Sequence, residues 1–88
     1  MYRIANVTDR SGKIQKPERI GRVIYEPRIE TFSDGLKRMY AVYGGEHYGK
    51  MIVTSPVIMN TYDPKTKSAV FVTENSIYTL ENFEDDLF

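Results

Sequence analysis

The sequence predicts a small all-β domain, an SH3-like or OB-like barrel of about six short antiparallel strands. One indication is a series of strand-like runs, rich in β-branched and aromatic residues, that are separated at short intervals by turn-forming residues. A second is that no segment shows a sustained helical period, so no helix is available to cover an open sheet. A third is the length of 88 residues, which suits one domain. Closing such a sheet into a barrel removes its unpaired edges.

The first half of the chain holds three predicted strands. Residues 2–7 form the first and end at a turn with Gly12, after which the polar residues 13–18 favour a loop or an edge segment. Residues 20–26 form the second, because Pro27 is tolerated only near a strand end or at an exposed edge. Residues 38–43 form the third, which the glycine-rich segment 44–49 ends. Only residues 36–40 and the last eight residues hold enough helical character for a turn or two.

The second half predicts one long or two short strands and then a hairpin. Residues 50–54 and 57–62 are strand-like, with a bend or bulge at Ser55 and Pro56 between them. Residues 63–67 form a turn, and residues 69–73 and 77–80 pair across a tight reversal at residues 74–76. We expect residues 1–88 to be a single domain, with residues 82–88 as an acidic C-terminal tail. That tail is either solvated or docks on a basic partner.

Composition excludes several classes of site and partner. The chain has no cysteine, which excludes disulfides, thiolate zinc sites and cysteine nucleophiles. Its apolar runs are too short to span a bilayer, and its first residues lack a signal-peptide block, so a cytoplasmic protein without a membrane partner is expected. Net charge is zero but uneven, because residues 1–50 carry ten Lys and Arg against six Asp and Glu. The two halves either neutralise each other in the fold or form a bipolar binding surface.

Two features suggest catalysis and fail on inspection. Residues 44–50 match the start of a phosphate-binding loop, but Met51 stands where that loop needs Ser or Thr, and a strand rather than a helix follows. His47, the only histidine, has the pKa range of a general base or metal ligand, yet its loop position favours an exposed residue. We therefore predict no catalytic residue, no metal, no cofactor and no enzymatic activity.

Tyrosine is the unusual feature of the composition, with seven in the chain. Tyrosine is enriched at protein interfaces, where its apolar ring and polar hydroxyl both contribute. Tyr43 and Tyr48 flank the glycine-rich loop that holds His47, and we predict that they are an exposed pair. These three residues are candidate binding residues.

Basic residues gather around the second predicted strand. Arg22 and Arg28 are further candidate binding residues, and Lys16 and Arg19 precede them. Strand alternation places Arg22 on the face opposite Tyr25, whereas single-stranded nucleic acid is bound by cationic and aromatic side chains on one face. A pI near 6.6 also gives little attraction to phosphates.

The segment Thr54-Ser55-Pro56-Val57 and residues 72–81 resemble small uncharacterised β proteins encoded by bacteriophages and prophages. The resemblance covers the C-terminal third and implies an accessory protein of a bacterial cytoplasm that binds and inhibits a host protein. The predicted function is a non-enzymatic protein that acts through a protein–protein interface. The alternatives are a small barrel that binds single-stranded nucleic acid and an enzyme or ligand-binding protein. Homo-oligomerisation through a strand edge is also open.

Overall fold

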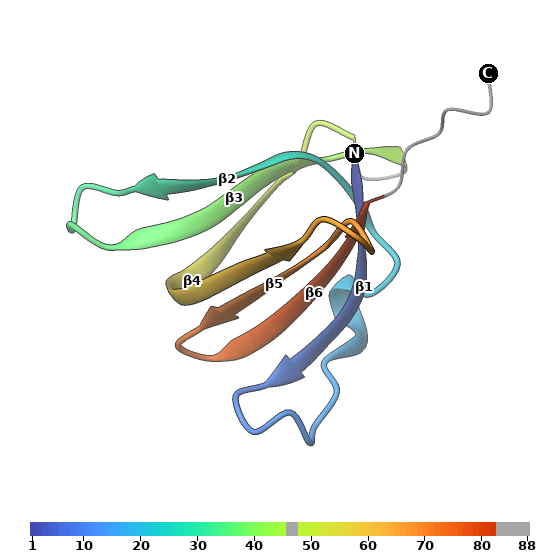
Figure 1. The fold of residues 1–88 in the computed structure, drawn as a ribbon. Coiled ribbons are helices and arrows are strands. Elements are labelled where there is room, and N and C mark those ends of the chain that lie inside the picture. Colours follow the sequence, from blue (N-terminus) through green and yellow to red (C-terminus); the bar gives the residue numbers. More distant parts are fainter. Residues whose placement is uncertain (46–47, 83–88) are drawn as a thin grey trace.

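The computed structural model describes residues 1–45 and 48–82, which form a closed antiparallel β-barrel (Figure 1). Each strand pairs with the next one along the chain, and the last strand pairs with the first. The prediction of a small all-β barrel of about six antiparallel strands is confirmed. The elements are β1 (Tyr2–Asp9), η1 (Pro17–Arg19), β2 (Val23–Thr31), β3 (Lys37–Tyr43), β4 (Met51–Asp63), β5 (Ser68–Thr73) and β6 (Ser76–Asn82).

The core consists of alternate residues from all six strands. Ile4 faces Leu80 across β1 and β6, and Ala41 faces Ile52 across β3 and β4; all four are at most 2% exposed. Burying one isoleucine or leucine side chain stabilises the fold by about 1.5–3 kcal/mol. The remaining buried hydrophobic residues are Val7, Ile24, Met39, Tyr43, Ala69, Phe71 and Tyr78.

Strand β4 is one long, bent strand that belongs to both sides of the barrel. Its first part pairs with β3 as far as Pro56, and its second part pairs with β5 from Val57 onward. Register shifts in both pairings accompany the change of partner, as expected of bulges that bend a strand. Figure 1 shows β4 turning from the β2–β3 side toward β5. The two runs at residues 50–54 and 57–62 are therefore one strand.

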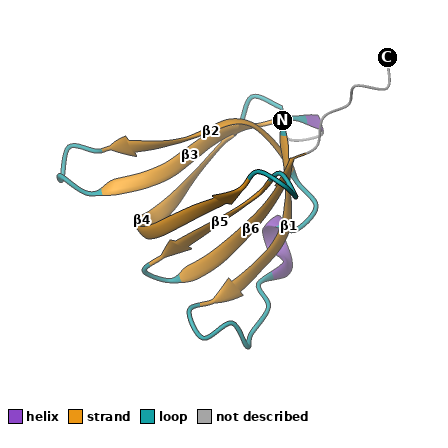
Figure 2. Cartoon of the chain, in the orientation of Figure 1, coloured by secondary structure: helices purple, strands orange, loops and turns teal. Residues whose placement is uncertain are grey.

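The segment from Gln15 to Arg22 fills the gap between β1 and β2. Direct β1–β2 pairing is confined to Tyr2 and Arg3. Further along β1, the Lys16 N–H donates to the Val7 carbonyl at 2.8 Å, and the Gly21 N–H donates to the Ile4 carbonyl at 2.8 Å. Between these two contacts the chain forms η1, which Figure 2 shows beside β1. Irregular backbone thus satisfies an edge that would otherwise be unpaired.

Several strand boundaries differ from the predicted ones, and three segments differ most. Strand β2 starts at Val23 and continues through Pro27 to Thr31, because a register shift there accommodates the proline. Residues 36–40 form no helical turn, because residues 37–40 belong to β3 and Leu36 precedes it. Of the predicted acidic tail, Asn82 ends β6, and residues 83–88 lie outside the described residues.

Candidate binding surface

Two rows of side chains cross three strands on the face of the sheet that points away from the core. The first row joins Tyr25, Val42 and Met51, which are directly opposite one another in β2, β3 and β4. The second row joins Arg28, Tyr40 and Val53 in the same order. We refer to these six residues as the sheet face.

Four of the six residues of the sheet face are exposed hydrophobic side chains. Met51 is 53% exposed, Val53 42%, and Tyr25 and Val42 each 38%. Isolated exposed hydrophobic residues are ordinary, but neighbours on adjacent strands form a contiguous patch of the kind found where proteins bind partners. Phe32, Tyr40, Met51 and Val53, with two polar neighbours, line a depression of about 440 Å³ at this face.

A bulge in β2 brings Tyr25 and Arg28 to the same face. Between Tyr25 and Arg28 the strand holds one residue more than its partner segment in β3. Glu26 adopts a positive φ of 49°, an unusual conformation for a side chain other than glycine, and Pro27 follows it. Strict alternation would point Tyr25 and Arg28 to opposite faces, so the inserted residue is what places them together.

The ring of Tyr25 lies against the backbone of Gly44. A Cβ atom added at Gly44 would come closer to Cε2 of Tyr25 than van der Waals contact permits. The glycine therefore permits a close approach of the ring that a larger residue would displace.

Ion pairs neutralise the arginines at the margin of the sheet face. Arg28 contacts Glu26 at 3.1 Å, and Arg38 contacts Asp34 through both of its terminal nitrogens, at 2.8 and 3.0 Å. The hydrogen bond from Arg38 contributes most to lowering the pKa of Asp34, and the hydrogen bond from the Leu36 N–H lowers this pKa further. The margin is polar and charged but carries little net charge.

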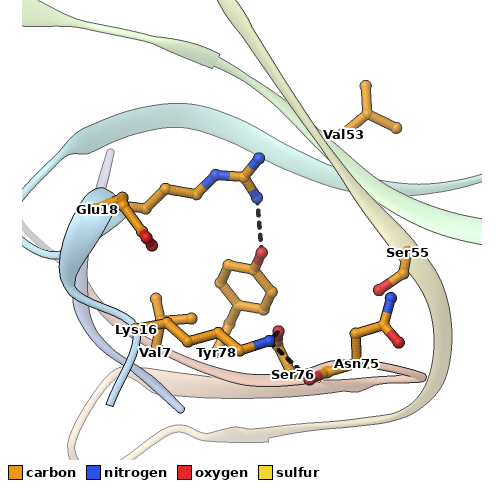
Figure 3. Close-up of a pocket in the computed structure, with 9 residues that line it drawn as sticks. Val7, Lys16, Glu18, Val53, Ser55, Asn75, Ser76 and Tyr78 are labelled. Carbon is orange, nitrogen blue, oxygen red and sulfur yellow. Dashed lines mark hydrogen bonds between the residues drawn. The ribbon is translucent and has the colours of Figure 1, made fainter. Parts of the chain in front are cut away.

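A second hollow of about 500 Å³ lies between η1, β6 and β4 (Figure 3). Arg19 Nη1 donates to the hydroxyl of Tyr78 at 2.6 Å. Lys16 Nζ donates to the Asn75 carbonyl at 3.0 Å and to the Ser76 hydroxyl at 2.9 Å. Val53 lines this hollow, which we call the η1 cavity, and also lines the depression of the sheet face. Val53 is thus a neighbour of both hollows.

The residues predicted to bind do not gather at one place. Tyr43 is only 4% exposed and belongs to the core, so the expectation that it is exposed is wrong; it ends β3, where alternation points it inward. Tyr48 is 79% exposed, as predicted. The Arg22 guanidinium stacks 5.1 Å from the centre of the Tyr43 ring, and Arg28 lies on the sheet face. His47 lies outside the described residues.

Sequence reasoning missed the η1 cavity and most of the sheet face. Lys16 and Arg19 were visible only as basic residues ahead of a strand. The sequence feature that could have predicted η1 is Pro17, a residue that often begins a helical turn. It lies between the two cations, and both side chains extend over β6.

No family model, curated protein or solved structure matches this chain. Within residues 1–45 and 48–82, no three His, Cys, Asp or Glu residues lie close enough together to hold a metal ion. The same part of the chain contains no helix long and apolar enough to cross a membrane.

Proposed function

We propose that this protein is a non-enzymatic binding protein whose sheet face contacts a protein partner. The observation that supports this most directly is the pair of cross-strand rows, in which exposed apolar side chains lie opposite one another on three strands. The barrel core is complete without them, so their exposure serves no packing role within the chain. A partner that covers them removes apolar area from water.

The energetics suit a partner that covers more than the sheet face. Completing the burial of Met51, Val53, Val42 and Tyr25 is worth roughly 1 kcal/mol for each side chain. A stable interface buries about 800 Å² on each side, with aromatic anchors near its centre. The sheet face supplies such a centre, with Tyr25 in one row and Tyr40 in the next, and the η1 cavity borders it at Val53.

The resemblance of the C-terminal third to phage-encoded proteins supports a bacterial host protein as the partner. In this proposal the chain is an accessory or inhibitory protein of a bacterial cytoplasm. Inhibition would follow from occupying a surface that the host protein needs, and it requires no chemistry from this chain.

Single-stranded nucleic acid is the second candidate ligand. The β2 bulge favours it, because Arg28 shares a face with Tyr25 and Tyr40, as base stacking on a cationic surface requires. The ion pairs of Arg28 with Glu26 and of Arg38 with Asp34 oppose it, because both cations are already neutralised. A mobility-shift titration with oligothymidylate at low salt tests it, and no shift at about 50 μM would remove this candidate.

A matched pair of methionine variants tests the protein–protein proposal. Met51→Glu places a charge in the sheet face, whereas Met59→Glu places it in the second part of the same strand, at a site 55% exposed against 53% for Met51. Tagged wild-type and variant proteins capture material from nuclease-treated bacterial lysate. We expect a discrete partner that Met51→Glu weakens about tenfold or more and that Met59→Glu retains.

Two outcomes would contradict the proposal. One is a partner that both variants retain equally, which would place the interface elsewhere. The other is capture that disappears after nuclease treatment in the wild type, which would favour nucleic acid. Thermal unfolding of both variants first establishes that each is folded.

A further inference from the structure

The η1 cavity holds more hydrogen-bond donors than acceptors. Arg19 uses one N–H toward Tyr78, and Lys16 is engaged only with neutral oxygens, the Asn75 carbonyl and the Ser76 hydroxyl. Among the described residues, neither cation has a carboxylate within ion-pair distance. Two positive charges therefore face a half-enclosed space, and neither is ion-paired within the described residues.

Tyr78 adds a donor from the floor of the cavity. Its side chain is only 5% exposed, and its hydroxyl accepts the hydrogen bond from Arg19. Because the oxygen accepts, its own proton points elsewhere, and no acceptor for it lies within hydrogen-bond distance among the described residues. Figure 3 shows the Tyr78 hydroxyl at one end of a dashed line, which marks the hydrogen bond that it accepts from Arg19. An oxygen of a bound anion is the acceptor that this group lacks.

The backbone holds both cations in place before any ligand arrives. The Lys16 N–H is bonded to β1 through the Val7 carbonyl, and Ile20, after Arg19, closes η1 through the Pro17 carbonyl at 3.1 Å. The buried Tyr78 hydroxyl and the Ser76 hydroxyl then orient the two side chains. Little conformational entropy is left to lose when an anion binds, which favours affinity.

We propose that the η1 cavity binds the carboxylate of an acidic side chain on the protein partner. The proposal rests on the proposed function, since the carboxylate would belong to the protein that covers the sheet face. Val53 lines both the η1 cavity and the depression of the sheet face. An acidic residue of the partner can therefore reach the two cations while the apolar residue beside it contacts Val53 and Met51.

The charge balance of the cavity favours a carboxylate over a phosphate. Glu18 lines the same cavity and is exposed at its rim. A phosphate monoester carries nearly two negative charges at neutral pH, so Glu18 repels it more strongly than it repels a singly charged carboxylate. Two cations and one carboxylate leave a charge of +1, which one incoming carboxylate neutralises.

The test is a titration of ¹⁵N-labelled full-length protein with sodium acetate, followed by NMR and referenced to sodium chloride at equal ionic strength. We expect saturable shifts at the amides of Lys16, Arg19 and Tyr78, with a dissociation constant on the order of millimolar. Arg19→Gln should weaken acetate binding about tenfold, and Tyr78→Phe several-fold, as loss of a charged and a neutral hydrogen bond predicts. Arg3→Gln, which removes the same charge from an exposed ion pair with Glu81 outside the cavity, is the matched control and should leave binding unchanged.

Separate arms distinguish the sources of the anion. Inorganic phosphate and oligothymidylate are titrated in the same way. Tighter binding of either one than of acetate would overturn the carboxylate assignment. Shifts that chloride reproduces, or that Arg19→Gln leaves unchanged, would overturn the site altogether. Tyr78→Phe keeps the buried ring, so it reports on the hydroxyl even where Arg19→Gln alters stability.

Acetate binding in the η1 cavity should not depend on the sheet face. Met51→Glu lies outside the residues that line the η1 cavity, so acetate binding should survive in that variant. If the protein binds acetate but the captured partner binds Met51→Glu as well as it binds the wild type, the proposed function alone is contradicted. A partner that needs Met51 but is unaffected by Arg19→Gln would contradict the carboxylate proposal alone.

Discussion

The buried hydroxyl of Thr73 bonds the β5–β6 turn, and removing this hydroxyl tests whether it stabilises that turn. The side chain is 0% exposed at the end of β5. Its Oγ1 accepts from the Ser76 N–H at 3.0 Å and from the Ser55 hydroxyl at 3.0 Å, and it donates to the Ser76 carbonyl at 3.1 Å. Thr73→Val keeps the shape of the side chain and removes these three bonds, together with a fourth and longer one that the Asn75 N–H donates to Oγ1 at 3.4 Å.

The magnitude follows from the groups left without partners. The Ser76 N–H and carbonyl each lose a partner in a buried setting, at a cost of about 1–3 kcal/mol each. Ser55 is half-buried, so its hydroxyl can turn toward water at little cost. We expect a loss of about 2–4 kcal/mol, toward the lower end if the turn opens to water. In a chain of this size that lowers Tm by roughly 10–25 °C.

The assay is urea unfolding followed by circular dichroism, with two control variants. Thr73→Ser keeps the hydroxyl and loses one methyl group, which should cost about 1 kcal/mol. Thr61→Val changes an exposed threonine of β4 and should stay within about 0.5 kcal/mol of the wild type. If Thr73→Val proves as stable as Thr73→Ser, the hydroxyl does not organise the turn and the reasoning is refuted.

Two further predictions concern the margin of the sheet face and low pH. Gly44→Ala should cost about 1 kcal/mol by displacing the Tyr25 ring, and a Tyr25→Ala background, measured by urea unfolding, should abolish that cost. The pKa of Asp34 lies below its ordinary 3.8, so its ion pair with Arg38 stabilises the fold above pH 3.8. That stability should fall as pH drops through the lower folded-state pKa; urea midpoints between about pH 6 and pH 2 that Asp34→Asn leaves unchanged would contradict this.

Patterns that depend on neighbouring residues were predictable from the sequence. Residues 38–43 form a strand, as their aromatic and branched residues indicate, and Glu74 and Asn75 form the tight reversal between β5 and β6. These elements follow from local turn chemistry and from period-two hydrophobicity, which one sequence displays directly.

Features that depend on register were not predictable. The bulge at Glu26 and Pro27 changes which residues share a face, and nothing in the local composition states whether a strand inserts a residue there. Tyr43 was expected in the exposed pair because it adjoins glycines, but the face it occupies is set by pairing with Ile24 in β2. The η1 cavity brings Lys16 against Ser76, a contact between distant parts of the chain.

The pairing of β1 with β6 has a consequence for the order of folding. Tyr2 lies opposite Asn82 and Asp9 opposite Ser76, so β1 finds most of its strand partners near the other end of the chain. The hairpins β2–β3, β4–β5 and β5–β6 close short loops, whereas docking β1 closes almost the whole chain at a larger entropic cost. We expect β1 to dock last, on the millisecond-to-second scale of proteins dominated by non-local pairing. Until it does, β6 presents a bare edge to other chains, and rapid synthesis at high concentration exposes the nascent protein to strand exchange.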